Sequence, residues 1–209
     1  MSRTNFVVRR NQSNRFRSFL LAAAVAAASL QVMASRAQNA PPDASAAGLQ
    51  EFGDRVEKYV QLHKSVESKL PKLKSTNEPE LLEAHQKILA RKIRNARAQA
   101  KHGDIFTPAA IEAFKKIISA EFQGPQSSQA KATMRQGAPL KEVHLRVNQV
   151  YPEHVPNTSV PPTLLQKLPK LPDEVAYRTV SSDLVLLDVK ANLVVDYLAG
   201  VIPAQNPEH

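Results

Sequence analysis

The sequence predicts an α+β protein, in which an N-terminal small helical bundle packs with a C-terminal antiparallel β meander of three to four strands. Three observations predict this class. Apolar residues recur at spacings of three and four between residues 49 and 122. After Pro139 this spacing gives way to short runs rich in Val, Leu and Tyr. Turn-forming residues separate the last three of these runs.

Residues 49–70 form the first predicted helix, which Pro71 ends because proline cannot continue a helix. The second helix is expected over residues 78–101, with Asn77 as its N-cap and Gly103 after its end. The predicted apolar faces are Leu49, Phe52, Val56, Tyr59, His63, Val66 and Leu70 in the first helix and Leu82, Leu89, Ile93, Ala96 and Ala100 in the second.

A third helix is expected to begin at Thr107-Pro108, with Thr107 as the cap and Pro108 in the first turn. Gly124 and Pro125 end it, and residues 126–136 are compatible with a weaker fourth helix. Because the connections between these helices are short, residues 49–137 are predicted to form a helical bundle.

Residues 138–174 are predicted to be a strand followed by a proline-rich connection. Residues 143–148 alternate between apolar and polar side chains, which is typical of a half-buried strand. The connection holds six prolines within residues 152–172, and we expect it to lie across another surface of the protein. The meander is predicted over residues 175–200, with strands at 175–180, 184–189 and 193–198, and a flexible tail over residues 201–209.

The first 37 residues have the pattern of an export signal. Arginines and no acidic residues precede an uncharged apolar run over residues 19–34, and small residues follow it. Cleavage is expected after Ala37 or Ala34, and residues 38–48 are expected to be a flexible linker. We therefore expect a periplasmic or secreted protein with no transmembrane helix in the mature chain. A retained signal acting as a membrane anchor is the alternative.

The positive charge of the chain belongs mainly to this signal. The 209 residues hold 28 Lys and Arg against 19 Asp and Glu, a formal net charge of +9 that suggests a nucleic-acid or membrane partner. Residues 1–37 hold six Arg and no acid, so that residues 38–209 hold 22 basic and 19 acidic residues, a net charge of +3. This distribution argues against a nucleic-acid partner.

The sequence contains no recognised catalytic motif. It has no cysteine, which excludes disulfides and cysteine nucleophiles, and it has no nucleophile-elbow, Walker A, dinucleotide-binding or HExxH motif. These absences lower the expectation of an enzyme without excluding one, because catalytic groups are recognised by geometry. Asp183, Asp188 and Asp196 are expected in turn and edge roles, and no cofactor is predicted.

His63 and His85 are the candidate metal ligands. Each lies on or beside the apolar face of one of the first two helices, and imidazoles on facing helices can share a metal ion. The alternative is that each is a hydrogen-bonded interior or boundary residue.

Lys87, Arg91 and Arg94 are the candidate anion-binding residues. They lie in the basic second half of the second helix, whose first half carries Glu80 and Glu83. The same gradient also complements the helix dipole, which contributes about 0.3–1 kcal/mol per charge, and this interpretation is favoured.

Two resemblances extend these predictions. The run from Tyr177 to Asp188, continuing to Val195-Asp196, resembles the C-terminal hairpin of the periplasmic nickel/cobalt-homeostasis family, with Ser181 in the place of Gly and Ala191-Asn192 in the place of Thr-Gly. That match covers one hairpin and implies its fold rather than metal homeostasis. Residues 50–200 resemble uncharacterised exported bacterial proteins, which implies an envelope or secreted protein of unknown activity.

The sequence therefore favours a non-enzymatic binding or structural module of the cell envelope. A partner would be an envelope protein or an anionic envelope polymer. A periplasmic metal- or anion-binding protein is the alternative, and a hydrolase with dispersed site residues is a third hypothesis.

Overall fold

The structure is a computed structural model that describes residues 43–72, 78–125, 127, 128, 130, 132, 143–152, 155 and 160–203. The expected signal over residues 1–37 lies outside the described residues, as does Asn77. Of the weak fourth helix, residues 127, 128, 130 and 132 are described, and they are helical.

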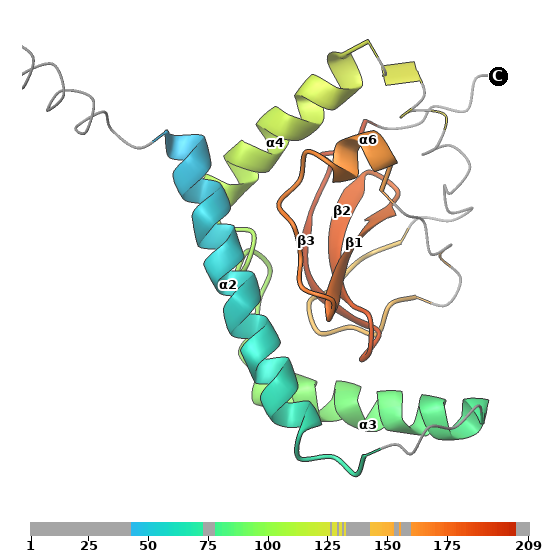
Figure 1. Ribbon diagram of the computed structural model, residues 1–209. Helices are drawn as coiled ribbons and strands as arrows, with labels where there is room; N and C mark the ends of the chain where they lie inside the picture. Colours follow the sequence, from blue (N-terminus) through green and yellow to red (C-terminus); the bar gives the residue numbers. More distant parts are fainter. Residues whose placement is uncertain are drawn as a thin grey trace, which may run out of the picture. The chain divides into compact units, whose positions relative to one another are not determined.

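Three long helices precede the sheet, and they are α2 (Ala44–Glu67), α3 (Pro79–Ala96) and α4 (Pro108–Gln123) (Figure 1). α2 begins earlier than predicted because the side chain of Asp43 accepts a hydrogen bond from the Ser45 amide and caps the helix. α4 begins and ends as predicted, with Thr107 as its N-cap and Gly124 as its C-cap. α3 is shorter than predicted, with Glu78 in the N-cap position and Arg97 in the C-cap position.

The three predicted strands form the predicted antiparallel meander. They are β1 (Val175–Val180), β2 (Asp183–Asp188) and β3 (Leu193–Leu198), and they pair in the order β1-β2-β3. Ser181 and Asn192 lie in the two turns with φ angles of 52° and 51°. The α+β fold class is therefore confirmed.

The fourth strand predicted over residues 143–148 does not form. The bridge to β3 is made instead by a residue further along the chain. Asn148 has a φ of 63°, which breaks the extended conformation. Beyond it, Val150 forms a single bridge with Leu193, and the amide of Tyr151 donates to the Asn192 carbonyl. The predicted alternation is still visible in burial, since Leu145 is buried.

Both faces of the sheet are covered, which explains why β2 is almost continuously apolar. On the first face the ring of Phe52 from α2 lies at the centre of an aromatic cluster with Phe106, Phe114 and Tyr177, at centroid distances of 5.1, 4.8 and 6.3 Å. On the second face Leu145, Tyr151 and Val155 pack against Val180, Val185, Leu187 and Val194. Ile202, which the sequence assigned to the tail, is buried in the main core.

α2 contacts α4 near its own beginning and α3 near its own end (Figure 1). The buried residues of α3 are Leu89, Ala90 and Ile93, all in its second half. Leu82 was predicted on the apolar face but is 47% exposed. Within the described parts of the chain, no helix has both the length and the apolar character that crossing a membrane requires.

Candidate functional site

Asp188 joins the end of β2 to α2 through a buried hydrogen-bond network. Its Oδ2 accepts hydrogen bonds from the Tyr59 hydroxyl at 2.5 Å and from His63 Nδ1 at 2.6 Å. Its Oδ1 accepts from the backbone amides of Lys190 and Ala191 at 3.1 and 2.8 Å. These four donors fill the acceptor sites of an ionised carboxylate, which makes its burial tolerable. The network fixes the turn between β2 and β3 against the helix.

The carboxylates around His63 raise the pKa of its imidazole. Burial lowers the pKa of His63, but the hydrogen bond and charge of Asp188 and the charge of Glu67 outweigh burial and hold that pKa above its ordinary value. His63 Nε2 lies 3.5 Å from one carboxylate oxygen of Glu67. The other carboxylate oxygen of Glu67 pairs with Lys190 Nζ at 2.9 Å. Burial and the charge of Asp188 raise the pKa of Tyr59 far above its usual range, so the phenol remains a donor.

Arg97 extends the network from the end of α3 to the sheet. Its guanidinium carbon lies 4.8 Å from the ring centroid of Tyr59, within the range of a cation–π contact. Its Nη1 donates to Asn148 Oδ1 at 3.0 Å, and its Nη2 donates to the Val195 carbonyl at 3.3 Å. The Asn148 amide in turn donates to the Arg97 carbonyl at 2.8 Å. This guanidinium therefore binds groups of the protein itself.

The other two aspartates of the meander also bind backbone amides. Asp196 is fully buried, and its Oδ2 accepts from the amides of Ile105 and Phe106 at 2.9 and 3.0 Å. Asp183 accepts from the amide of Gly200 at 2.9 Å. Asp183 and Asp188 therefore have the turn role expected for them. Asp196 does not, because it is buried within β3 and binds amides of the segment between α3 and α4.

The two candidate metal ligands have different surroundings. His63 is fully buried with Nδ1 on Asp188, whereas the half-buried His85 lines an opening of about 560 Å³ that it shares with Lys64, Glu67 and Ser68. No group of three or more His, Cys, Asp or Glu side chains in the described segments is arranged to hold a metal ion. The hydrogen-bonded interior role considered for His63 is what the structure shows, and metal binding stays a prediction.

The candidate anion-binding residues Lys87, Arg91 and Arg94 are exposed on α3. Lys87 pairs with Glu83, with Nζ and carboxylate 2.5 Å apart. Because both side chains of this pair are more than half exposed, solvent screens it strongly. Anion binding by these residues likewise stays a prediction.

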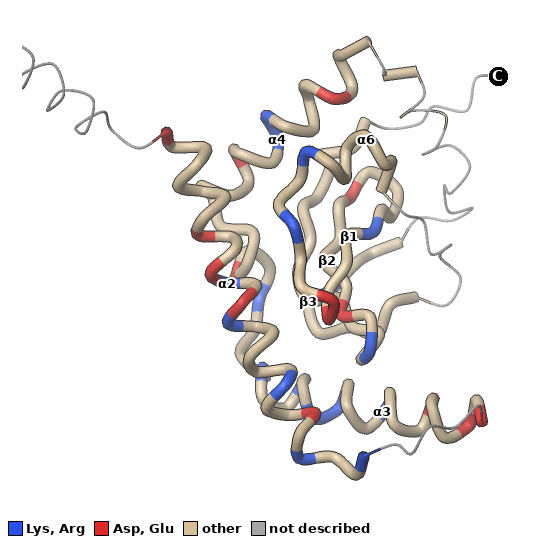
Figure 2. The backbone as a smooth tube through the Cα atoms, viewed as in Figure 1, with Lys and Arg blue, Asp and Glu red and all other residues tan. Residues whose placement is uncertain are grey.

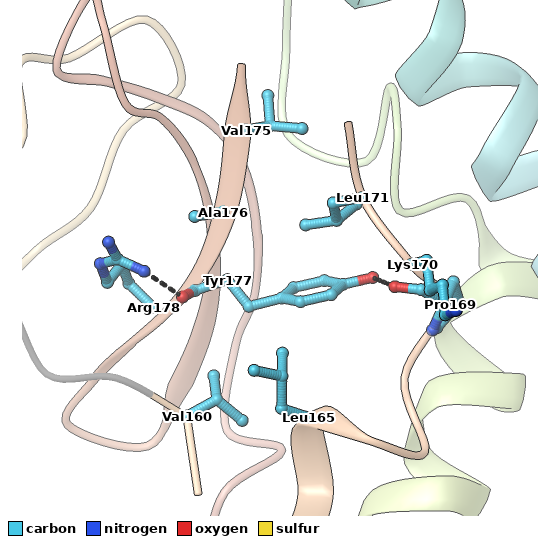
Figure 3. A pocket seen from close by; sticks show the side chains of 9 residues that line it. All are labelled: Val160, Leu165, Pro169, Lys170, Leu171, Val175, Ala176, Tyr177 and Arg178. Carbon is cyan, nitrogen blue, oxygen red and sulfur yellow. Dashed lines mark hydrogen bonds between the residues drawn. The ribbon is translucent and has the colours of Figure 1, made fainter. Parts of the chain in front are cut away.

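A mainly apolar groove of about 390 Å³ runs along β1, and no sequence motif pointed to it (Figure 3). Consecutive strand residues point to opposite faces of a sheet, so a groove lined by all of 175–178 follows the strand edge rather than one face. The lining residues are Val160, Leu165, Pro169, Lys170, Leu171, Val175, Ala176, Tyr177 and Arg178.

The outer wall of the groove is held in place by three hydrogen bonds. The Tyr177 hydroxyl donates to the Pro169 carbonyl at 3.2 Å across the groove (Figure 3). The short helix α6 (Pro162–Leu165) contributes Leu165 to the groove, and its Thr163 hydroxyl donates to the buried Glu121 carboxylate. Lys167 Nζ lies 2.6 Å from the other oxygen of Glu121, and these two hydrogen bonds lower the pKa of Glu121. The groove is therefore preformed.

β1 is an edge strand among the segments that the structure describes, since its only paired neighbour there is β2. In an antiparallel pair the backbone groups of alternate residues point away from the partner strand. The Arg178 guanidinium donates to the Tyr177 carbonyl at 2.8 Å, which identifies Tyr177 as one of these residues (Figure 3). Lys170 and Arg178 place positive charge at the rim of the groove.

Sequence reasoning missed this groove because its walls come from different segments. The only available signal was the cluster of apolar residues among the prolines of residues 160–172, which were expected to cover another surface. Val160, Leu164 and Leu168 do so, whereas Leu165 is 50% exposed at the groove. Comparison of the chain with family models, curated proteins and solved structures finds no match.

Proposed function

We propose that the protein is an exported, non-enzymatic binding module that holds an extended segment of a partner polypeptide in the groove along β1. The observation that carries the proposal is the coincidence of a preformed apolar groove with an edge strand. An extended peptide can add to such an edge through main-chain hydrogen bonds, while its side chains enter the adjacent pocket. The export signal predicted for residues 1–37 would make an envelope protein the partner.

The charge at the groove rim favours a segment that carries an acidic group beside its apolar side chains. Lys170 is exposed at one wall, and Arg178 lies half-buried on the strand. Opposite charge at the rim orients a ligand and steers its approach more than it adds affinity. The cavity volume of about 390 Å³ falls within the ~300–1,000 Å³ of ordinary ligand pockets.

The buried polar residues support a binding role over catalysis. His63 and Asp188 would be the strongest acid–base pair, but both side chains are fully buried. Their short contact ties α2 to the sheet, so its evident use is to support the fold on which the groove is built.

Selection of displayed random ten-residue peptides on the purified protein tests the proposal. We expect enriched peptides to combine alternating apolar residues with Asp or Glu. Leu165→Glu should abolish their binding, because it introduces an anion beside the groove at a position that is already 50% exposed. Val189→Glu is the matched control, since Val189 is 38% exposed and does not line the groove.

Two results would overturn the proposal. One is the absence of any peptide enriched over a bare surface. The other is peptides that bind the Leu165→Glu and Val189→Glu variants equally well.

A further inference from the structure

The first half of α3 presents an apolar surface that the described part of the protein does not cover. Leu81, Leu82 and Ile88 are 47%, 47% and 37% exposed, although helices in proteins gain most of their stability from packing an apolar face. Leu81, His85, Ile88 and Lys92 follow one another at spacings of four, three and four, so they form one stripe along the helix. This stripe, here called the α3 stripe, is distinct from the buried face of the helix.

Acidic residues lie in the first half of α3 and basic residues in its second half. Glu80 and Glu83 are exposed in the first half, and exposed Arg91 and Lys92 lie in the second half. Figure 2 shows the acidic residues at the N-terminal end of the helix and basic residues toward its other end. The helix dipole accounts for such a gradient in an isolated helix, but it does not account for exposed Leu and Ile beside it.

We infer that the α3 stripe is a self-association surface, on which α3 of a second copy lies antiparallel. Such a pairing is a closed two-fold interface, because the same patch serves both copies. It places the acidic half of each helix against the basic half of the other, whereas a parallel pairing would bring like charges together.

Each part of the surface has a defined role in this pairing. When Leu81 lies opposite Ile88 of the second copy, the apolar residues fill the centre of the contact. Arg91 then lies beside the first helical turn of the other copy, which carries Glu80. The apolar contacts supply the affinity, and the charges select the antiparallel orientation.

Sedimentation velocity over a range of protein concentrations tests the inference. The wild-type protein should form a dimer whose dissociation constant rises at least tenfold when salt is raised from 0.05 to 0.5 M, since salt screens exposed charges. Leu81→Ser combined with Ile88→Ser should leave only monomer. Val189→Ser, at an exposed apolar position outside α3, should dimerise as the wild type does.

A charge-swap pair gives the sharper test. The first variant carries Glu80→Lys, which reverses the charge on the acidic side of the contact. The second carries Arg91→Glu, which reverses the charge on the basic side. Each alone should be monomeric, because residues 80 and 91 of antiparallel copies would then carry like charges where they meet. An equimolar mixture should form a heterodimer, and circular dichroism should show that each variant has native helix content.

Three outcomes would overturn the inference. The wild type could remain monomeric up to about 1 mM, or the swapped variants could each dimerise alone. Binding of a monomeric wild type to vesicles of phosphatidylglycerol through Leu81 and Ile88 would assign the stripe to a membrane surface instead.

Discussion

His63 Nδ1 lies 2.6 Å from Asp188 Oδ2, and 125 residues of chain separate the two side chains. The contact joins α2 to the end of β2, the central strand of the sheet. Because Asp188 also accepts two amides of the following turn, the same carboxylate sets the position of β3. A single buried anion therefore connects three elements of the fold.

Replacement of Asp188 should lower the free energy of unfolding. Asp188→Asn keeps the shape of the side chain but removes the charge that Tyr59 and His63 bind. We expect a loss of about 3 kcal/mol in the free energy of unfolding, as is typical when a buried charged partner is removed. Urea denaturation measures it. Asp183→Asn, at a half-exposed turn position, is the control and should cost under about 1 kcal/mol; equal losses would contradict the structural role of Asp188.

The raised pKa of His63 makes stability depend on pH. A group whose pKa is higher in the folded state stabilises the protein fully below its unfolded value of about 6.5, and that contribution is lost as pH rises through the folded pKa. The free energy of unfolding should therefore fall as pH rises above about 6.5. In His63→Gln this part of the pH dependence should disappear. Parallel curves for wild type and variant from pH 6 to 9 would show that His63 does not titrate as described.

Two glycines of α2 offer a matched pair of substitutions. A Cβ on Gly48 would lie 2.4 Å from the Ala109 carbonyl oxygen, whereas a Cβ on Gly53 would meet nothing within 4 Å. Gly48→Ala should destabilise by about 1–3 kcal/mol, because the start of α4 must move. Gly53→Ala should stabilise by about 0.5–1 kcal/mol through helix propensity. Thermal unfolding compares them, and a similar effect of both changes would rule out the close helix contact.

The mass of the protein recovered from its host tests the predicted export signal. We expect a chain that begins at Gln38 or Ser35, found in the periplasm or the medium. A chain that retains Met1 and fractionates with the cytosol would contradict export. A retained N-terminus in the membrane fraction would favour the anchor instead.

Most of the fold could be predicted because its signals are local. The apolar spacing of Phe52, Val56 and Tyr59, the Thr107-Pro108 start of α4 and the turns at Ser181 and Asn192 each act within a few residues. The missing fourth strand depends on the left-handed conformation of Asn148, whose side chain is bound by Arg97 of a distant helix. A contact between segments so far apart produces no periodic pattern in the sequence.

The candidate site could not be predicted for the same reason. The sequence drew attention to His63 as a residue on a helix face, but its partner Asp188 lies in the meander. The groove needs Leu165 and Tyr177 at the same place, although neither is part of a motif. Helical spacing placed Leu82 in the core, yet no described element packs on that end of α3.

Amide hydrogen exchange of β1, with and without a peptide selected on the protein, tests the proposed binding mode most directly. Val180 and Asp183 flank a two-residue turn and therefore pair with each other, so the backbone groups of Tyr177 and Thr179 point to the open edge. If a peptide adds to this edge, exchange at Tyr177 and Thr179 should slow at least tenfold, while α3 amides such as Ile88 stay unchanged. A peptide that binds without slowing exchange anywhere in β1 would contradict strand addition.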